Sequence, residues 1–409
     1  MRLFDIVSII LFICAIFSFI NFKYLKLPNT IGIMLITIIS SLFLLFLKLF
    51  GLNLYDHILV FTQSISFDKA LLEWMLCFLL FSGSISVNIE DLKEYKWSIL
   101  VFSTISLIIS VFLISTSLYY LLISFNINLS YIYCLLFGAL ISPTDPIAVL
   151  GILRKAKTPR EIEINIVGES LFNDGFGVVI FVVLMNILLA KEAFSISSVF
   201  LLFLRESVGG IVLGIISGLI AYKMIKQIDN YLIEILITLS LVTSLYSIAS
   251  ILHVSGLLGV IVAGILIGNK ARNSVMSDKT KIHLDIFWEI IDELLNFMLF
   301  ALIGLQLLNI NFSLEYIIIS LCVIPIALIS RFISIFIPVS ILKLIQNIIP
   351  NTSKIMTWGG LRGGLSIALA LSLPNGDEKN LILVMTYSIV IFAIIVQGLT
   401  IKYLVKSND

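Results

Sequence analysis

The chain contains a succession of apolar windows, each long enough to cross a lipid bilayer, and this feature constrains the fold most. A transmembrane helix needs about 20 mostly apolar residues to span the hydrocarbon core. Of the 409 residues, 60% are hydrophobic and only 12% are charged, whereas a soluble domain carries about 25% charged residues. The windows cover 4–20, 29–48, 70–88, 98–123, 130–152, 160–189, 198–222, 231–251, 255–268, 286–308, 314–342, 353–373 and 380–404. We therefore expect an all-α polytopic membrane protein with about 13 transmembrane helices.

Lys and Arg residues are distributed unevenly over the connections between these windows. Alternate connections carry most of them, at Lys23, Lys26, Lys93, Lys96, Arg154, Lys155, Lys157, Arg160, Lys223, Lys226, Lys270, Arg272, Lys279, Lys281, Lys343, Lys354, Lys402 and Lys406. The other side has only Arg2, Lys48, Lys69, Lys191 and Lys379. Because positive residues concentrate on the cytoplasmic side, we expect the N-terminus outside and the C-terminus in the cytoplasm. The connections are short, so 1–409 is predicted to be one transmembrane domain in the plasma membrane of a bacterium or archaeon.

Two windows contain sequence that a regular helix does not favour. In the fifth, Ser142–Pro146 places two prolines around Asp145, and in the twelfth, Gly359–Gly364 places four glycines around Arg362. Proline removes a backbone donor and glycine weakens a helix. Non-helical backbone at membrane depth is tolerated only where protein or a water-filled cavity satisfies it. Two interrupted helices, one in each half, indicate a transporter site built on inverted repeats; packing kinks are the alternative.

The sixth window contains a polar octet, Gly168–Gly175, where an uncompensated charge is costly. A carboxylate at the centre of a membrane helix costs about 2.5–3.5 kcal/mol on insertion scales. On a helix, Ser170 and Asp174 share one face, while Glu169 and Asn173 share the neighbouring face. One stripe is therefore a candidate for coordinating a cation, and the other for holding the structure together.

Arg331 is the only charge in the central part of the eleventh window and needs a carboxylate partner, because an unpaired buried arginine is strongly destabilising. We predict that this partner is Glu169. Arg362 is the competing arginine, which otherwise compensates the ends of the interrupted helices, and Asp145 is a competing carboxylate. Pairing of Glu169 with Arg331 leaves Asp145 and Asp174 as the carboxylates of a cation site.

Four stretches resemble the sodium/proton exchanger branch of the monovalent cation:proton antiporters, in particular the NhaP-like group. They occur in the order of that family, and the hydropathy pattern agrees over the whole chain. The stretches are Ser142–Val149, Gly168–Gly175, Asn296–Gln306 and Trp358–Gly364.

The resemblance implies an NhaA-like antiporter fold of about 13 helices, a homodimer, and alternating access. A core bundle that includes 70–189 and 286–373 would move against a dimerisation part formed by the remaining helices.

The resemblance also implies roles for residues of the site. Asp174 would be the essential carboxylate for ion and proton, and Asp145, Ser170 and the Thr144 backbone would complete a Na⁺ site. Asn173 stands where electrogenic relatives have a second aspartate, which implies electroneutral exchange of one cation for one proton. Glu169 and Arg331 match a pair of the family. Several relatives have an acidic residue between Phe81 and Gly83, where this chain has Ser82, and Glu73 two turns earlier is a candidate substitute.

The expected activity is secondary antiport of Na⁺ or Li⁺ against H⁺, with cation and proton competing for Asp174 and Asp145. Hard oxygen ligands suit these ions. The sequence has no nucleotide-binding loop, catalytic constellation or nucleic-acid motif, so neither an enzyme nor a cofactor is expected. A K⁺/H⁺ antiporter would share nearly every feature. A cation channel or an ion sensor is a more distant alternative, and a sensor would be expected to carry a soluble output domain.

A further acidic group lies at the predicted inner end of the tenth window, at Asp285, Glu289, Asp292 and Glu293. Acidic residues are stabilising near a helix N-terminus. We therefore expect interfacial charge near a helix start, with a cation-attracting funnel as the alternative.

Overall fold

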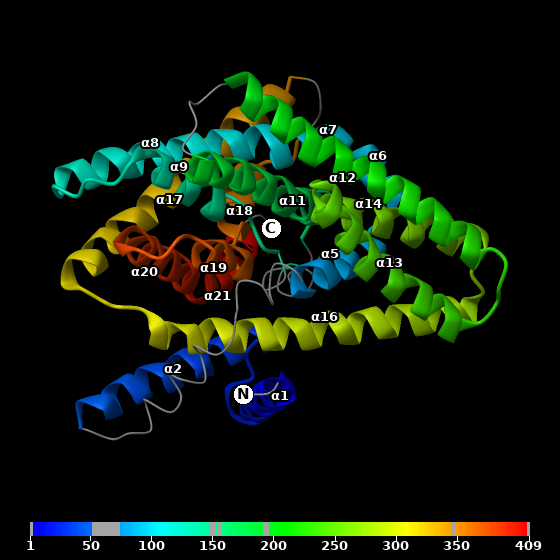
Figure 1. Cartoon of the computed structure of the whole chain (residues 1–409), viewed down its shortest axis with the longest axis horizontal. Helices are drawn as coiled ribbons and strands as arrows, with labels where there is room; N and C mark the ends of the chain where they lie inside the picture. The colour runs from blue at the N-terminus through cyan, green and yellow to red at the C-terminus, as the bar shows by residue number, and fades with distance from the viewer. Residues whose placement is uncertain are drawn as a thin grey trace.

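The computed structural model describes residues 3–50, 74–146, 150, 153, 158–190, 196–344 and 348–406. These residues are almost entirely helical and contain no strand, only one isolated bridge between two residues (Figure 1). Nine helices of the described part are long and apolar enough to cross a membrane, and α5 and α9 are shorter apolar helices. The all-α polytopic class is thereby confirmed, whereas the expected number of 13 crossings is not settled by these nine.

The helices of the first half of the chain lie within the described residues 3–50, 74–146 and 158–190. Their bounds are α1 (Leu3–Ile20), α2 (Asn29–Leu49), α5 (Leu76–Ile85), α6 (Ile89–Glu94), α7 (Lys96–Val101), α8 (Leu107–Ser124), α9 (Tyr131–Ile141) and α11 (Arg160–Ala190). A π-helical turn at Phe102–Ser106 joins α7 to α8.

The second half begins with three helices that pack on one another and ends with the second interrupted helix. The bounds are α12 (Ile196–Ile225), α13 (Tyr231–Leu252), α14 (Gly256–Leu266), α15 (Arg272–Ser274), α16 (Asp278–Gln306), α17 (Leu314–Leu342), α18 (Thr352–Gly359), α19 (Gly364–Leu371), α20 (Asp377–Phe392) and α21 (Gly398–Lys406).

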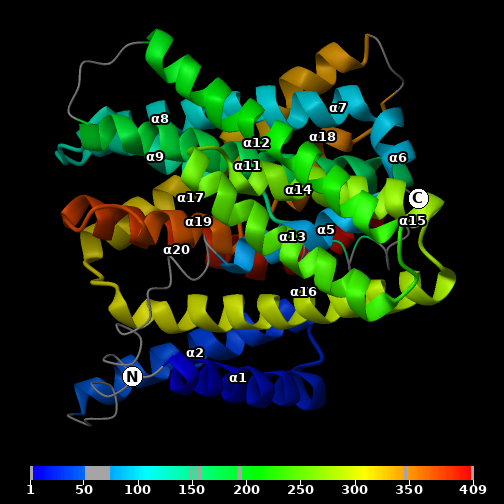
Figure 2. The same ribbon diagram turned by 45° about the vertical axis from the view of Figure 1, so that its right-hand side comes forward.

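The long helix α16 lies between two parts of the molecule (Figures 1 and 2). Helices α1 and α2 pack on one side of it, and α5, α13 and α19 contact it from the other parts of the bundle. The contact with α2 is close because Gly304 has no side chain, and the hydroxyl of Ser41 donates to its carbonyl oxygen at 2.8 Å. Helix α16 therefore connects the α1–α2 pair to the helices around the polar centre.

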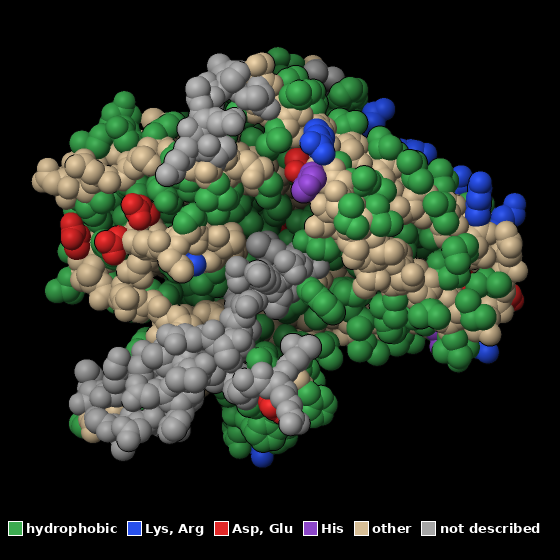
Figure 3. Space-filling model, viewed as in Figure 1, with side chains coloured by type: hydrophobic (Ala, Val, Ile, Leu, Met, Phe, Trp, Pro, Cys, Tyr) green, Lys and Arg blue, Asp and Glu red, His purple; other side chains and the backbone are tan. Residues whose placement is uncertain are grey.

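The surface matches a lipid-embedded protein. In the most apolar 18-residue windows of α1 and α12, only 17% of the window is buried inside the protein. In the α20–α21 segment the buried share is 72%. Figure 3 shows many hydrophobic side chains across this face, with Lys and Arg side chains along its right-hand edge, near the ends of α12 and α16. Connections at these ends are among those that the sequence predicts to be cytoplasmic.

Both predicted helix interruptions are confirmed. Helix α9 ends at Ile141, directly before Ser142–Pro146, and α18 ends at Gly359 before α19 starts at Gly364. The two unwound stretches meet in an antiparallel bridge between Asp145 and Leu361. One boundary prediction was wrong: the tenth window was expected over 286–308, but α16 begins at Asp278 because Ser277 caps it by accepting from the N–H of Thr280.

Close packing of α12 on α14 generates a first prediction. A Cβ at Gly214 would overlap the carbonyl oxygen of Gly259, a backbone atom that cannot move aside. Gly214→Ala should therefore lower the free energy of unfolding by about 1–3 kcal/mol, measured by thermal or denaturant unfolding in detergent. Ile216→Ala on the same helix, where the side chain is 52% exposed, is the control and should change stability less. Equal stability of Gly214→Ala and the wild type would contradict this packing.

Candidate cation-binding site

The two unwound stretches form the centre of the molecule. Each provides hydrogen-bond partners for backbone groups of the other. The N–H of Asp145 donates to the carbonyl oxygen of Leu361 at 2.9 Å. The guanidinium of Arg362, which is 4% exposed, donates to the carbonyl oxygen of Pro143 at 3.1 Å. A Cβ at Gly363 would overlap the side chain of Asp145. Glycine at this position therefore lets the second break approach the carboxylate closely.

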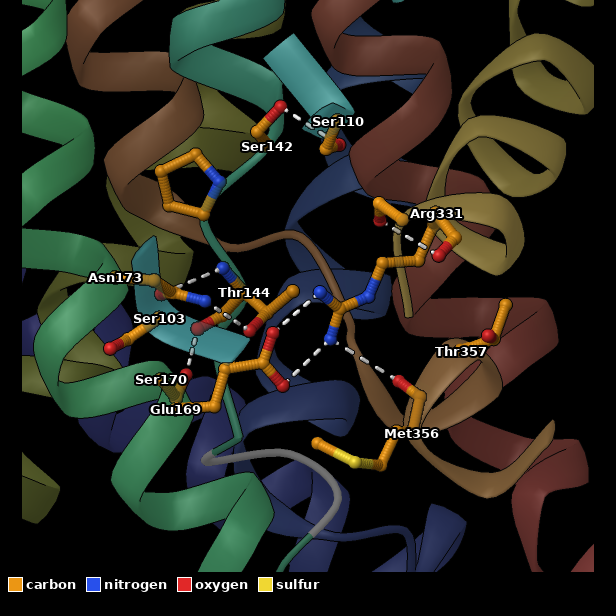
Figure 4. Close-up of polar contacts among 12 residues, drawn as sticks. Ser103, Ser110, Ser142, Thr144, Glu169, Ser170, Asn173, Arg331, Met356 and Thr357 are labelled. Carbon is orange, nitrogen blue, oxygen red and sulfur yellow. Dashed lines mark hydrogen bonds and ion pairs between the residues drawn. The ribbon is translucent and has the colours of Figure 1, made fainter. Parts of the chain in front are cut away.

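Helix α11 holds Thr144 of the first break in place through two side chains (Figure 4). The hydroxyl of Ser170 donates to the carbonyl oxygen of Thr144. The amide of Asn173 accepts from the N–H of Thr144 at 3.3 Å and donates to its hydroxyl oxygen at 3.0 Å. All three residues are almost fully buried. The sequence predicts Asn173 at the site. Its two hydrogen bonds to Thr144, however, follow only from the way the unwound stretch lies against α11.

Glu169 and Arg331 form a buried, bidentate ion pair, as predicted (Figure 4). Nη1 and Nη2 of Arg331 donate to the two carboxylate oxygens of Glu169 at 2.5 and 2.8 Å, and the side chains are 3% and 2% exposed. Nη2 also donates to the carbonyl oxygen of Met356 at 3.4 Å. A Cβ at Gly360 would lie 2.9 Å from Nε of Arg331, so the glycine break leaves room for the guanidinium.

A cavity of about 690 Å³ is lined by the two other carboxylates of the site, Asp145 and Asp174. Its walls include Thr144, Asp145, Ser170 and Asp174, but not Glu169. Asp174 lies about 21 Å along α11 from its start at Arg160, because a helix rises 1.5 Å per residue. The structure thus brings the four predicted ligands to one cavity, where carboxylate, hydroxyl and carbonyl oxygens are the ligands that hard cations prefer.

The cavity extends to one end of the helices. Its outer walls are Ser86–Asn88 after α5, Gly268–Asn269, and the segment with Arg272 and Asn273, next to connections rich in Lys and Arg. Ser82 is on the wall, but its hydroxyl donates to the carbonyl oxygen of Trp288 at 3.0 Å. Glu73 lies outside the described residues, so its suggested contribution stays a prediction.

The acidic group on the tenth window was interpreted wrongly as charge near a helix start. Because α16 begins at Asp278, these residues lie two to four turns inside the helix. Asp285, Glu289 and Asp292 line the cavity, which matches the funnel alternative, whereas Glu293 is exposed and is not part of its wall. Asp285 is paired with Arg272 at 2.5 and 2.7 Å. This hydrogen bond raises the pKa of Arg272, so its guanidinium keeps its charge.

Two helix breaks that meet beside cavity-lining carboxylates indicate the class of secondary transporters, which are not enzymes. The chain belongs to the sodium/hydrogen exchanger family, whose transmembrane model matches residues 8–407. Over 407 residues it is 41% identical to the Na⁺/H⁺ antiporter NhaP of Pseudomonas aeruginosa, covering 98% of this chain and 96% of that protein. It is 31% identical to the Na⁺/H⁺ antiporter NhaH of Halobacillus dabanensis, covering 94% and 93%.

The fold is also that of a solved antiporter. The structure of MjNhaP1, a sodium proton antiporter from Methanocaldococcus jannaschii, superposes with a TM-score of 0.75 at 20% identity, and the match covers 99% of both chains. The antiporter fold expected from the resemblance is thereby confirmed.

The buried ion pair gives a second prediction. Glu169→Gln leaves the Arg331 charge buried without a partner, which should lower the free energy of unfolding by about 3–5 kcal/mol. The double variant with Arg331→Gln should recover part of this loss, because neither charge is then buried. Chemical or thermal unfolding in detergent measures both.

The matched control is the Arg160–Asp91 pair, which has a similar distance of 2.8 Å but a 74% exposed arginine. Arg160→Gln should cost at most about 1 kcal/mol. If Glu169→Gln were no more destabilising than this control, the buried pair would not hold the structure together.

Proposed function

We propose that this protein is a secondary active antiporter that exchanges Na⁺ or Li⁺ for H⁺ across the plasma membrane. The observation that carries the proposal is the pair of carboxylates, Asp145 and Asp174, on the wall of one cavity at the crossing of two helix breaks. The names of the relatives support the same ions. Glu169 is neutralised by Arg331, so it takes no part in binding the ion.

The exchange follows from charge balance in the cavity. Two carboxylates at one site repel each other when both are ionised, and a bound cation or a proton relieves this repulsion. Cation and proton therefore compete for Asp174 and Asp145, with Ser170 and the Thr144 backbone as further oxygen ligands. Because only a loaded site is exposed to alternate sides, movement of one ion drives the other and no ATP is required.

The structure suggests how access alternates. The cavity extends to the end that carries Arg272 and Asp285, which we assign to the cytoplasm. A core bundle including 70–189 and 286–373 would move relative to the remaining helices, which form the dimerisation part of a homodimer. The exposed apolar surfaces of α1 and α12 are consistent with a role of these helices in dimerisation.

Exchange is proposed to be electroneutral, one cation for one proton. Asn173 is neutral, and both ends of its amide are engaged by Thr144. The site then has two carboxyl groups, one of which exchanges its proton for a cation. A second titrating carboxylate at position 173 is absent, so no additional proton is carried per cycle.

Loss of either carboxylate should abolish transport. In proteoliposomes with an internal pH dye, a Na⁺ gradient should move protons through the wild type, but Asp174→Asn and Asp145→Asn should remain at the background of empty vesicles. Glu315→Gln, at an exposed carboxylate in the first turn of α17, is the control and should retain activity. Full Na⁺-driven proton movement by Asp174→Asn would contradict the role of Asp174 in binding the ion. Wild-type activity with K⁺ but not with Na⁺ would indicate a K⁺/H⁺ antiporter.

The stoichiometry has its own test. When valinomycin and K⁺ clamp the membrane potential of the same vesicles at values from about −100 to +100 mV, the initial rate of Na⁺/H⁺ exchange should not change. Each net charge moved would contribute about 2.3 kcal/mol per 100 mV. A rate that depends steeply on the potential would contradict one-for-one exchange.

A further inference from the structure

A polar stripe on α16 runs along the cavity toward the central carboxylates. Asp285, Glu289 and Asp292 follow one another at helical spacing and all line the cavity. The next positions on the same face are Asn296, which is buried next to Asp292 and is not itself on the cavity wall, and Leu299, which is again on the wall. A Cβ at Gly364 would lie 2.5 Å from Leu299, so this stripe ends beside the second helix break.

Asn296 has an unsatisfied oxygen on this stripe. The residue is 2% exposed, and its Nδ2 donates to Oδ2 of Asp292 at 3.2 Å. Its Oδ1 is buried and has no hydrogen-bond partner among the described residues. A buried acceptor without a donor is destabilising, because it loses its hydrogen bond to water and gains none in return. A cation held by the neighbouring Asp292 would satisfy this oxygen as a ligand.

Asp292 is distinct from the other carboxylates of the cavity. Asp285, at the outer end of the stripe, is already compensated by Arg272. Asp292 forms no ion pair within the described ranges. No three His, Cys, Asp or Glu residues in those ranges lie close enough to hold one metal ion together, so Asp292 does not join Asp145 and Asp174 in a single centre.

We propose that Asp292 and Asn296 form an outer binding site for a partly hydrated monovalent cation. The site would lie on the path between the cavity mouth and the Asp145–Asp174 site. A carboxylate oxygen and an amide oxygen supply two hard ligands, and the open cavity leaves room for the ion's remaining water ligands. The outer site captures the cation before it replaces the proton at the central site. This inference rests on the proposed exchange function.

The test compares concentration dependence with maximal rate in proteoliposomes in which the α15–α16 face is exposed to Na⁺. Asp292→Asn keeps the size of the side chain and removes its charge, so the apparent KM for Na⁺ should rise about tenfold. The maximal rate should stay within about twofold of the wild type, because the central site is intact. Asn296→Leu removes the free oxygen at similar volume and should raise KM about threefold.

Two matched variants separate a binding site from a general effect of charge. Glu293→Gln removes the neighbouring exposed carboxylate, which is not on the cavity wall, and should leave KM unchanged. Glu289→Gln removes a charge from the same wall. If Glu289→Gln raised KM as much as Asp292→Asn, and Asn296→Leu had no effect, Asp292 would act only through the overall negative charge of the cavity. The outer site would then be overturned. A wild-type KM in Asp292→Asn, or a loss of maximal rate alone, would overturn it too.

Direct binding distinguishes failure of this inference from failure of the proposed function. Purified Asp174→Asn protein should retain weak ²²Na⁺ binding in a scintillation proximity assay, and adding Asp292→Asn should remove it. If wild-type vesicles showed no Na⁺-driven proton movement but this residual binding were present, the exchange assignment would fail and the outer site would stand. If wild-type vesicles were active but folded Asp174→Asn protein showed no residual binding, the outer site alone would be overturned.

Discussion

The buried ion pair between Glu169 and Arg331 determines how the centre of this protein is arranged. It connects α11 to α17, and the contact of Arg331 with the carbonyl oxygen of Met356 extends the connection to α18. Removing two charges from water is costly, and only good geometry with further hydrogen bonds offsets that cost. Here the geometry is bidentate, and the glycine break at Gly360 provides the space for it. The pair thus fixes α11 relative to the second helix break.

With α11 fixed, its next turn holds the first break through Ser170 and Asn173, and the two breaks meet at Asp145 and Leu361. Of the carboxylates near the centre, one is neutralised by an arginine, while Asp145 and Asp174 face the cavity. The stripe of Asp285, Glu289 and Asp292 on α16 continues this acidic surface outward. The same elements therefore support the fold, define the central site and line the route to it.

Much of this arrangement could be predicted from the sequence, because the costs of placing polar groups in a membrane are large. Prolines around Asp145 and glycines around Arg362 predicted the breaks, and a lone Arg331 predicted a carboxylate partner. The role of Asn173 as a clamp could not be predicted, since it depends on the path of the unwound Thr144 backbone. The start of α16 was misplaced because its first turns are amphipathic rather than apolar. For this reason the sequence predicts charges near a helix start where the structure has cavity-lining carboxylates.

The central claim is that Na⁺ and H⁺ compete for the same pair of carboxylates. Calorimetric titration of the purified protein with Na⁺, in buffers of different ionisation enthalpy, counts the protons released per ion bound. Near the pH at which the site is half protonated, binding should release about half a proton per ion, rising toward one proton at lower pH, and the release should vanish in Asp174→Asn. Sodium binding that releases no proton at any pH, in a protein that transports Na⁺, would contradict the account.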